Sequence, residues 1–260
     1  MSLTGLHILV TRPKGQAEKL LAGIHAAGGT GVHYPVMQIA PLDKTVDATI
    51  YQTCKQLIMD IDQFQHIIFI SGNAVKFGME WISQYWPQLP IGLKWYGIGS
   101  STIASLQREN VVVNETSHIG SMDSETLLQH PDLQQLAQQK VLIVRGVGGR
   151  EYLAEQLSAR GATVEYAECY RRGIETSPVE QLPAVIKEKR IDIICVNSVE
   201  SLQHLITMAS ESLNELQKKA VVVPGERVAA FAKDKGFTQI TVANNASDQA
   251  VLACLSTLAK

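Results

Sequence analysis

Two arginines around a glycine cluster form the stretch of this sequence best suited to bind an anion. Arg145 and Arg150 enclose Gly-Val-Gly-Gly directly after the apolar run 141–144. A glycine-rich turn that leads from a strand into a helix exposes backbone N–H groups, and the helix N-terminus adds partial positive charge. This is not a dinucleotide fingerprint, because Glu151 stands where its third glycine belongs. The turn therefore favours a ligand that carries carboxylate or phosphate groups.

Five further strand-to-helix turns carry small or hydroxyl-bearing residues. Ligands of open parallel sheets lie outside the carboxyl ends of the strands, where these turns are expected. A Ser, Thr or Asn there is also an ordinary N-cap, and for any single loop this is the simpler interpretation. Six such loops in two domains together favour a polyanionic ligand. The residues expected to contact it are Thr11, Arg12, Ser71, Gly72, Asn73, Ser101, Thr102, Arg145, Gly146, Arg150, Asn197, Ser198, Gly225 and Glu226.

Tyr170 is a further side chain with a chemical use. It follows the expected strand Val164–Cys169 and precedes Arg171 and Arg172, where the chain is expected to cross between two domains. From this position alone, a structural tyrosine with an interfacial hydroxyl is favoured over a reacting one.

Several common sites are not indicated. The seven histidines show neither H-x-x-x-H nor H-E-x-x-H spacing, so no metal site is expected. A Walker A lysine loop and a G-x-S-x-G nucleophile elbow are also missing from the sequence. The four cysteines lie far apart without C-x-x-C pairing, which favours buried free thiols in a reducing compartment.

The charge balance argues against a dedicated nucleic-acid surface. The 23 basic and 25 acidic residues give a net charge of -2, whereas tracking of phosphates needs a surplus of Lys and Arg. No apolar run approaches the ~20 residues that span a bilayer, and the first residues lack a signal-peptide pattern. We therefore expect a cytoplasmic protein with no membrane partner.

Apolar runs alternate with amphipathic helical patterns along the chain. This alternation predicts parallel sheets with right-handed crossovers, divided into two sheets of four or five strands. Helices are expected over 46–59 and 179–189, with Pro13 in the first turn of an earlier helix and a cap at 121–125 before another. The strands are expected at His7–Thr11, Val32–Pro35, His66–Ile70, Lys94–Ile98, Val111–Val113, Val141–Val144, Val164–Cys169, Ile191–Val196, Ala220–Val223 and Ile240–Val242.

Short motifs spread over the full length resemble the uroporphyrinogen-III synthase family. Their order and spacing carry the resemblance. They are Leu9–Pro13, Tyr34-Pro35, Phe69–Ser71 with Asn73–Val75, Gly97–Gly99 with Thr102, Ser124-Glu125 with Leu127-Leu128, Val144–Gly146 with Gly148–Glu151, Arg160–Ala162, Cys169–Arg172, and Val242-Ala243 with Ala246 and Asp248. The resemblance implies two doubly wound parallel-sheet α/β domains, of flavodoxin or Rossmann type, with a two-stranded linker and a cleft between them. The domains would comprise residues 1–36 plus 172–260, and residues 37–171.

The resemblance also implies a reaction. Family members cyclise hydroxymethylbilane, a linear tetrapyrrole with eight carboxylates, to uroporphyrinogen III with loss of water and inversion of ring D. No cofactor is implied, and the matching Tyr170 would be the acid that protonates the departing hydroxyl. We expect a monomer whose partners are this small-molecule substrate and, transiently, the preceding enzyme of the pathway.

Two alternatives stay open at this point. One is a regulatory module of the same fold that binds a tetrapyrrole without converting it. The other is a two-domain binding protein for sugars or other small molecules, which would normally carry a secretion signal.

Overall fold

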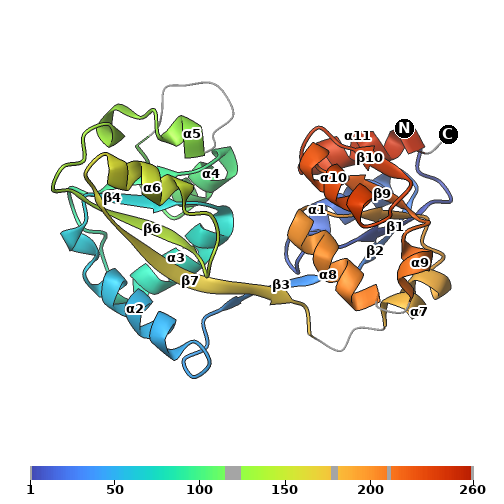
Figure 1. Ribbon diagram of the computed structural model, residues 1–260, viewed down its shortest axis with the longest axis horizontal. Helices are drawn as coiled ribbons and strands as arrows, with labels where there is room; N and C mark the ends of the chain where they lie inside the picture. The colour runs from blue at the N-terminus through green and yellow to red at the C-terminus, as the bar shows by residue number, and fades with distance from the viewer. Residues whose placement is uncertain (1, 115–123, 177–180, 210–211, 259–260) are drawn as a thin grey trace. The chain divides into compact units, whose positions relative to one another are not determined.

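Short apolar runs form most strands of two five-stranded sheets. The computed structural model describes residues 2–114, 124–176, 181–209 and 212–258. Its contacts divide the chain into unit 1, Met1–Ile39 with Gly173–Lys260, and unit 2, Ala40–Arg172. The chain crosses between the units inside strands β3 (Met37–Pro41) and β7 (Thr163–Ile174), which are neighbours in one sheet (Figure 1). The crossings expected at 36/37 and 171/172 are thus displaced to 39/40 and 172/173.

The sheet of unit 1 has the order β2-β1-β8-β9-β10, and its neighbouring strands pair in parallel. Numbered within the unit this is 2-1-3-4-5, the order of a doubly wound flavodoxin-like sheet. Its strands are β1 (His7–Val10), β2 (Thr30–His33), β8 (Ile193–Cys195), β9 (Ala220–Val223) and β10 (Ile240–Val242).

Both faces of this sheet are buried. Leu9 and Ile194 pack into one apolar cluster, and the adjacent Ile8 and Cys195 pack into the other, as the two-residue period of a strand requires. The first face is covered by α7 (Leu182–Glu188), α8 (Val199–Ala209), α9 (Leu213–Leu216) and α10 (Glu226–Asp234), and the second by α1 (Glu18–Ala26) and α11 (Asp248–Leu258).

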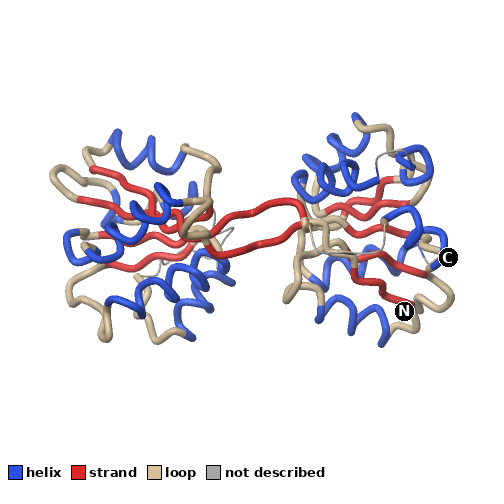
Figure 2. Tube along the Cα trace, turned by 90° about the horizontal axis from the view of Figure 1, so that it is seen from below, coloured by secondary structure: helices blue, strands red, loops and turns tan. Residues whose placement is uncertain are grey.

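Unit 2 repeats this arrangement. Its parallel strands β5-β4-β6-β7 follow the order 2-1-3-4, and β3 occupies the fifth place. The remaining elements are β4 (His66–Phe69), β5 (Lys94–Gly97), β6 (Lys140–Gly146), α2 (Ala48–Met59), α3 (Gly72–Tyr85), α4 (Ser100–Arg108), α5 (Ser124–Leu127), α6 (Tyr152–Ala159), and the short 3-10 helices η1 (Ile61–Gln63) and η2 (Pro131–Leu133). Helices α2 and α3 lie on one face of the sheet and α6 on the other (Figure 1), and Figure 2 shows helices on both sides of each sheet. The expected α/β class is confirmed.

Four local predictions are wrong. Arg145 and Gly146 belong to β6 rather than to a turn, and β7 continues through Tyr170 to Ile174 because it pairs onward with β3. Helix α1 begins at Glu18, so Pro13 lies in the preceding loop. The strand expected at Val111–Val113 is reduced to one bridge between Val113 and Trp95. The cap predicted at residues 121–123 and the start of the helix predicted over 179–189 lie outside the described residues.

A buried histidine at the start of β4 makes the stability of unit 2 dependent on pH. Burial lowers the pKa of His66 from its ordinary 6.5, although its ring bonds the Tyr96 hydroxyl at 3.1 Å and the side-chain amide oxygen of Gln139 at 2.5 Å. Lys94 and His130 also lower this pKa, while Gln139 and Asp132 oppose the shift. The unfolded chain then binds more protons than the folded one just below pH 6.5, so acidification favours unfolding.

We expect the free energy of unfolding to fall as the pH drops below about 6.5, by at most about 1.4 kcal/mol per pH unit from this residue. The measurement is urea denaturation of the wild type and of His66→Gln across that range. The variant should show a shallower dependence, since other groups titrate in both proteins. Equal slopes would contradict this assignment.

Candidate active site

The strand orders define one switch point in each unit, where consecutive crossovers leave in opposite directions. In unit 1 it lies between β1 and β8, and in unit 2 between β4 and β6. Ligands of doubly wound sheets bind outside the carboxyl ends of such strands. Thr11 and Arg12 with Asn197 and Ser198 follow the first pair, and Ser71–Asn73 with Gly146 stand at the second.

Tyr170 lies at the switch point of unit 2 and is almost completely buried. Only 3% of its surface is exposed, and its hydroxyl lies 3.3 Å from the Ser71 hydroxyl. Its ring stacks on Phe77 of α3 with centroids 5.1 Å apart, and it also packs against Gly146. A Cβ atom at Gly146 would lie 2.6 Å from the tyrosine ring, so only glycine fits there without a shift. Phenol, serine and glycine thus form one packed group.

A bulge directs Tyr170 into this group. Arg145 pairs with Glu168 but Gly146 pairs with Tyr170, so Cys169 is an extra residue in β7. Strict alternation from Tyr166, which packs on the α6 side, would put Tyr170 on that same face. Tyr170 instead contacts Ser71 and Phe77 on the α3 side. No pattern in the sequence indicated this bulge, and Phe77 was not among the expected site residues.

The side chain of Arg145 is folded back onto the loop that follows β6. The residue is 2% exposed, and its side chain donates hydrogen bonds to the carbonyl oxygens of Gly146, Gly148 and Arg150. The guanidinium also lies 3.5 Å from Glu151 and 4.5 Å from the centre of the Tyr166 ring.

Glu151 and Tyr166 complete this network. Burial, followed by the hydrogen bond to Glu151, raises the pKa of Tyr166 to about 12, so this phenol stays protonated at neutral pH. Substrate contact by Arg145 remains a prediction, and it would require the network to open.

Replacing Arg145 by methionine tests these two roles. If the guanidinium mainly orders the loop, the free energy of unfolding should fall by about 1.5–3 kcal/mol, because charged hydrogen bonds to backbone carbonyls are lost. Chemical denaturation and steady-state kinetics of the variant give the answer. Unchanged stability together with a raised KM would instead assign the side chain to substrate binding.

The predicted residues of unit 1 are held by the fold in a similar way. Thr11 is fully buried and donates a hydrogen bond of 2.8 Å to the Cys195 carbonyl, which ties the end of β1 to β8. Arg12 forms an ion pair with Asp248 and also bonds the carbonyl oxygen of Ala246 at 2.9 Å. The Arg12 side chain therefore clamps the loop before α11.

The remaining predicted residues lie at or next to the N-termini of helices. Ser198 caps α8 by accepting a hydrogen bond from the amide of Ser201 at 3.0 Å, and Asn197 accepts one from the Ser201 hydroxyl at 2.6 Å. Ser101 is exposed in the first turn of α4 whereas the neighbouring Thr102 is buried. Gly225 and Glu226 begin α10, and Arg150 is exposed before α6. The structure thus brings Ser71 and Gly146 to Tyr170, while these other residues lie at the starts of their own helices.

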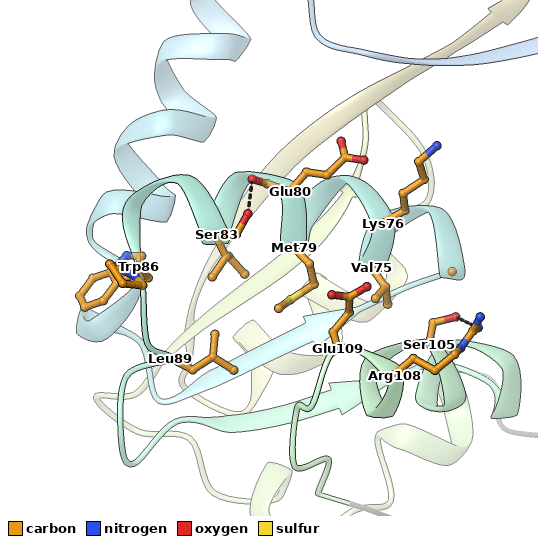
Figure 3. A pocket seen from close by; sticks show the side chains of 13 residues that line it. Val75, Lys76, Met79, Glu80, Ser83, Trp86, Leu89, Ser105, Arg108 and Glu109 are labelled. Carbon is orange, nitrogen blue, oxygen red and sulfur yellow. Dashed lines mark hydrogen bonds between the residues drawn. The ribbon is translucent and has the colours of Figure 1, made fainter.

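A cavity of about 560 Å³ lies on unit 2 between α3 and α4. Figure 3 shows Lys76 and Arg108 at one end and Trp86 and Leu89 at the other. Two cations and two carboxylates line it, so it offers no net positive charge to a polyanion. Of the predicted contact residues it includes Gly72, and Tyr170 does not line it.

A family model and several curated relatives that match this sequence all carry the same description. The family model described as uroporphyrinogen-III synthase HemD matches residues 18–253. A uroporphyrinogen-III synthase of Escherichia coli strain K12 is 31% identical over 259 residues, covering 96% of this chain and 100% of the relative. One of Proteus mirabilis is 30% identical over 202 residues, covering 78% and 98%.

Solved structures agree in fold. Uroporphyrinogen III synthase of the extremely thermophilic bacterium Thermus thermophilus, as a mutant, superposes with a TM-score of 0.62 at 13% identity and covers 98% of each chain. The enzyme of Helicobacter pylori 26695 also gives a TM-score of 0.62, at 14% identity, and covers 97% of this chain and 99% of its own.

Two doubly wound parallel sheets, each with helices that begin at the carboxyl ends of its strands, define an α/β protein with two flavodoxin-like units. The chain belongs to the uroporphyrinogen-III synthase family, and it is an enzyme. Within residues 2–114, 124–176, 181–209 and 212–258, no helix is long and apolar enough to cross a membrane.

Proposed function

We propose that Tyr170 is the acid with which this enzyme converts hydroxymethylbilane to uroporphyrinogen III. The reaction closes the linear tetrapyrrole, releases water and inverts ring D. One observation supports the acid role above the others, namely that the phenol lies at the switch point of unit 2 within hydrogen-bond distance of the N-cap of α3. In this role Tyr170 would donate its proton to the substrate hydroxyl as the carbon–oxygen bond breaks.

The substrate carries eight carboxylates, and the carboxyl-edge loops of both units are proposed to bind them. Backbone N–H groups at the starts of α3, α8 and α10 offer donors and the positive end of the helix dipole. Arg150 is exposed in the loop before α6 and adds a cation. Arg12 and Arg145 act mainly by ordering their loops.

Positioning explains how such a site controls the product. Closure in solution gives the symmetric isomer, so the protein must hold the ends of the chain in a geometry that solution does not favour. Fixing reacting groups in this way removes much of the entropic barrier and needs no prosthetic group in the proposed route. We further propose that the enzyme acts as a cytoplasmic monomer, contacts the preceding pathway enzyme transiently and binds no nucleic acid.

The test is a product analysis. Purified protein is given freshly made hydroxymethylbilane, and the products are oxidised and separated into type I and type III isomers. The proposal predicts a dominant type III product at a rate far above that without protein. Formation of type I isomer alone, at the spontaneous rate, would contradict the proposal. It would favour the alternative of a module that binds a tetrapyrrole without converting it, which no comparison supports.

A further inference from the structure

The surroundings of the Tyr170 hydroxyl are set by protein atoms. The residue as a whole is 3% exposed, so protein atoms make up most of its surroundings. The Ser71 hydroxyl lies 3.3 Å from it, while Phe77 and Gly146 enclose the ring. The packed ring has little freedom to turn toward another partner.

A second contact of Ser71 leaves its hydroxyl hydrogen free for donation to Tyr170. Ser71 is the N-cap of α3, and its oxygen accepts a hydrogen bond from the Ala74 amide at 3.1 Å. A hydroxyl has one hydrogen to donate, and the Ala74 amide does not use it. Donation of that hydrogen to Tyr170 completes a chain from Ala74 through Ser71 to the phenol oxygen, in which each bond polarises the next.

We propose that Ser71 is a positioning residue that donates its hydroxyl hydrogen to the Tyr170 oxygen. This inference rests on the proposed role of Tyr170 as the acid. An accepted hydrogen bond on the phenol oxygen leaves the phenol's own proton directed away from Ser71 and available to the substrate. Ser71 was expected to contact the substrate, and the geometry assigns it to Tyr170 instead.

The same hydrogen bond stabilises the product of the proton transfer. The phenol proton goes to the substrate hydroxyl, the carbon–oxygen bond breaks with its electron pair on oxygen, and water leaves. The bilane becomes an azafulvenium cation and Tyr170 a phenolate. The ring-D hydrogen that is released on final closure restores the phenol, so no outside proton source is needed. During this interval Ser71 and the N-terminal end of α3 face the phenolate with a donor and with partial positive charge.

Ser71→Gly and Ser71→Thr separate the hydroxyl from the cap. Glycine at an N-cap costs helices only a few tenths of a kcal/mol relative to serine, so Ser71→Gly should fold while lacking the donor. We expect its kcat to fall roughly 10- to 100-fold with KM nearly unchanged, the size expected for a hydrogen bond to a charged group. Ser71→Thr, which keeps the hydroxyl, should restore most of kcat.

A double-mutant cycle with Tyr170→Phe decides whether Ser71 acts through Tyr170. In the Tyr170→Phe background, Ser71→Gly should change kcat by less than about twofold. An equal fold decrease in kcat in both backgrounds would overturn the inference and assign Ser71 a structural role. A raised KM with unchanged kcat would overturn it as well and assign Ser71 to substrate binding. If the wild type forms the type III isomer, either of these results refutes the role of Ser71 alone. If the wild type forms no type III isomer, the proposed function itself is refuted.

Discussion

Replacing Tyr170 by phenylalanine is expected to lower kcat by roughly 10²–10⁴-fold, the usual contribution of a general acid. KM should change little, because the ring and its packing on Phe77 remain. The lost hydrogen bond to Ser71 is long, at 3.3 Å, so the stability cost should be about 0.5–1.5 kcal/mol or less. Initial rates of type III isomer formation over a range of hydroxymethylbilane concentrations measure the effect.

Tyr96→Phe is the matched control. Tyr96 is another buried tyrosine of unit 2, and its hydroxyl bonds His66 at 3.1 Å instead of Ser71. Loss of that hydroxyl should reduce stability slightly and leave kcat near the wild-type value. If both variants lose activity equally, the effect of Tyr170→Phe is structural. If Tyr170→Phe keeps full turnover, Tyr170 is not the acid.

Gly146→Ala should both destabilise unit 2 and impair turnover. Its methyl group would lie 2.6–3.1 Å from three atoms of the Tyr170 ring, which cannot move freely because the ring stacks on Phe77. Overpacking of this kind typically costs about 1–3 kcal/mol. A shifted phenol would also lose its alignment with Ser71, so kcat should fall at least about tenfold. Chemical denaturation and steady-state kinetics check the two effects.

Two companion variants show whether the ring is the cause. Gly173→Ala, in the continuation of β7, adds a methyl group that meets nothing within 4 Å and should leave stability almost unchanged. In a Tyr170→Leu background the clashing ring is gone, and Gly146→Ala should cost clearly less than in the wild type. An equal cost in both backgrounds would place the conflict elsewhere.

Local patterns predicted the framework of this protein because each element is defined by its own residues. Strands β9 and β10 have the predicted bounds, since each is a short β-branched run between turn or helix signals. Ser71 begins α3 as its N-cap, as the hydroxyl before an amphipathic run predicted. The alternation of such elements was sufficient to predict two parallel sheets, and the family resemblance implied that they are doubly wound.

Features that depend on distant segments could not be derived in this way. The extra Cys169 that turns Tyr170 toward α3 exists only in the pairing of β7 with β6. Arg145 looked available for an anion because the carbonyl oxygens and Glu151 that bind it follow it in a loop whose shape has no sequence signature. Similarly, β7 extends past Arg172 because β3 lies beside it, which the polar residues at its end did not indicate.

The role of Tyr170 as proton donor is tested most directly by changing the leaving group of the substrate. A bilane that carries an acetate ester in place of the terminal hydroxyl loses an anion and needs no proton at that step. The ratio of kcat/KM between wild type and Tyr170→Phe should then fall from roughly 10²–10⁴ to near one, with type III isomer still formed. The same large ratio with both substrates would show that Tyr170 acts at another step and would contradict the account.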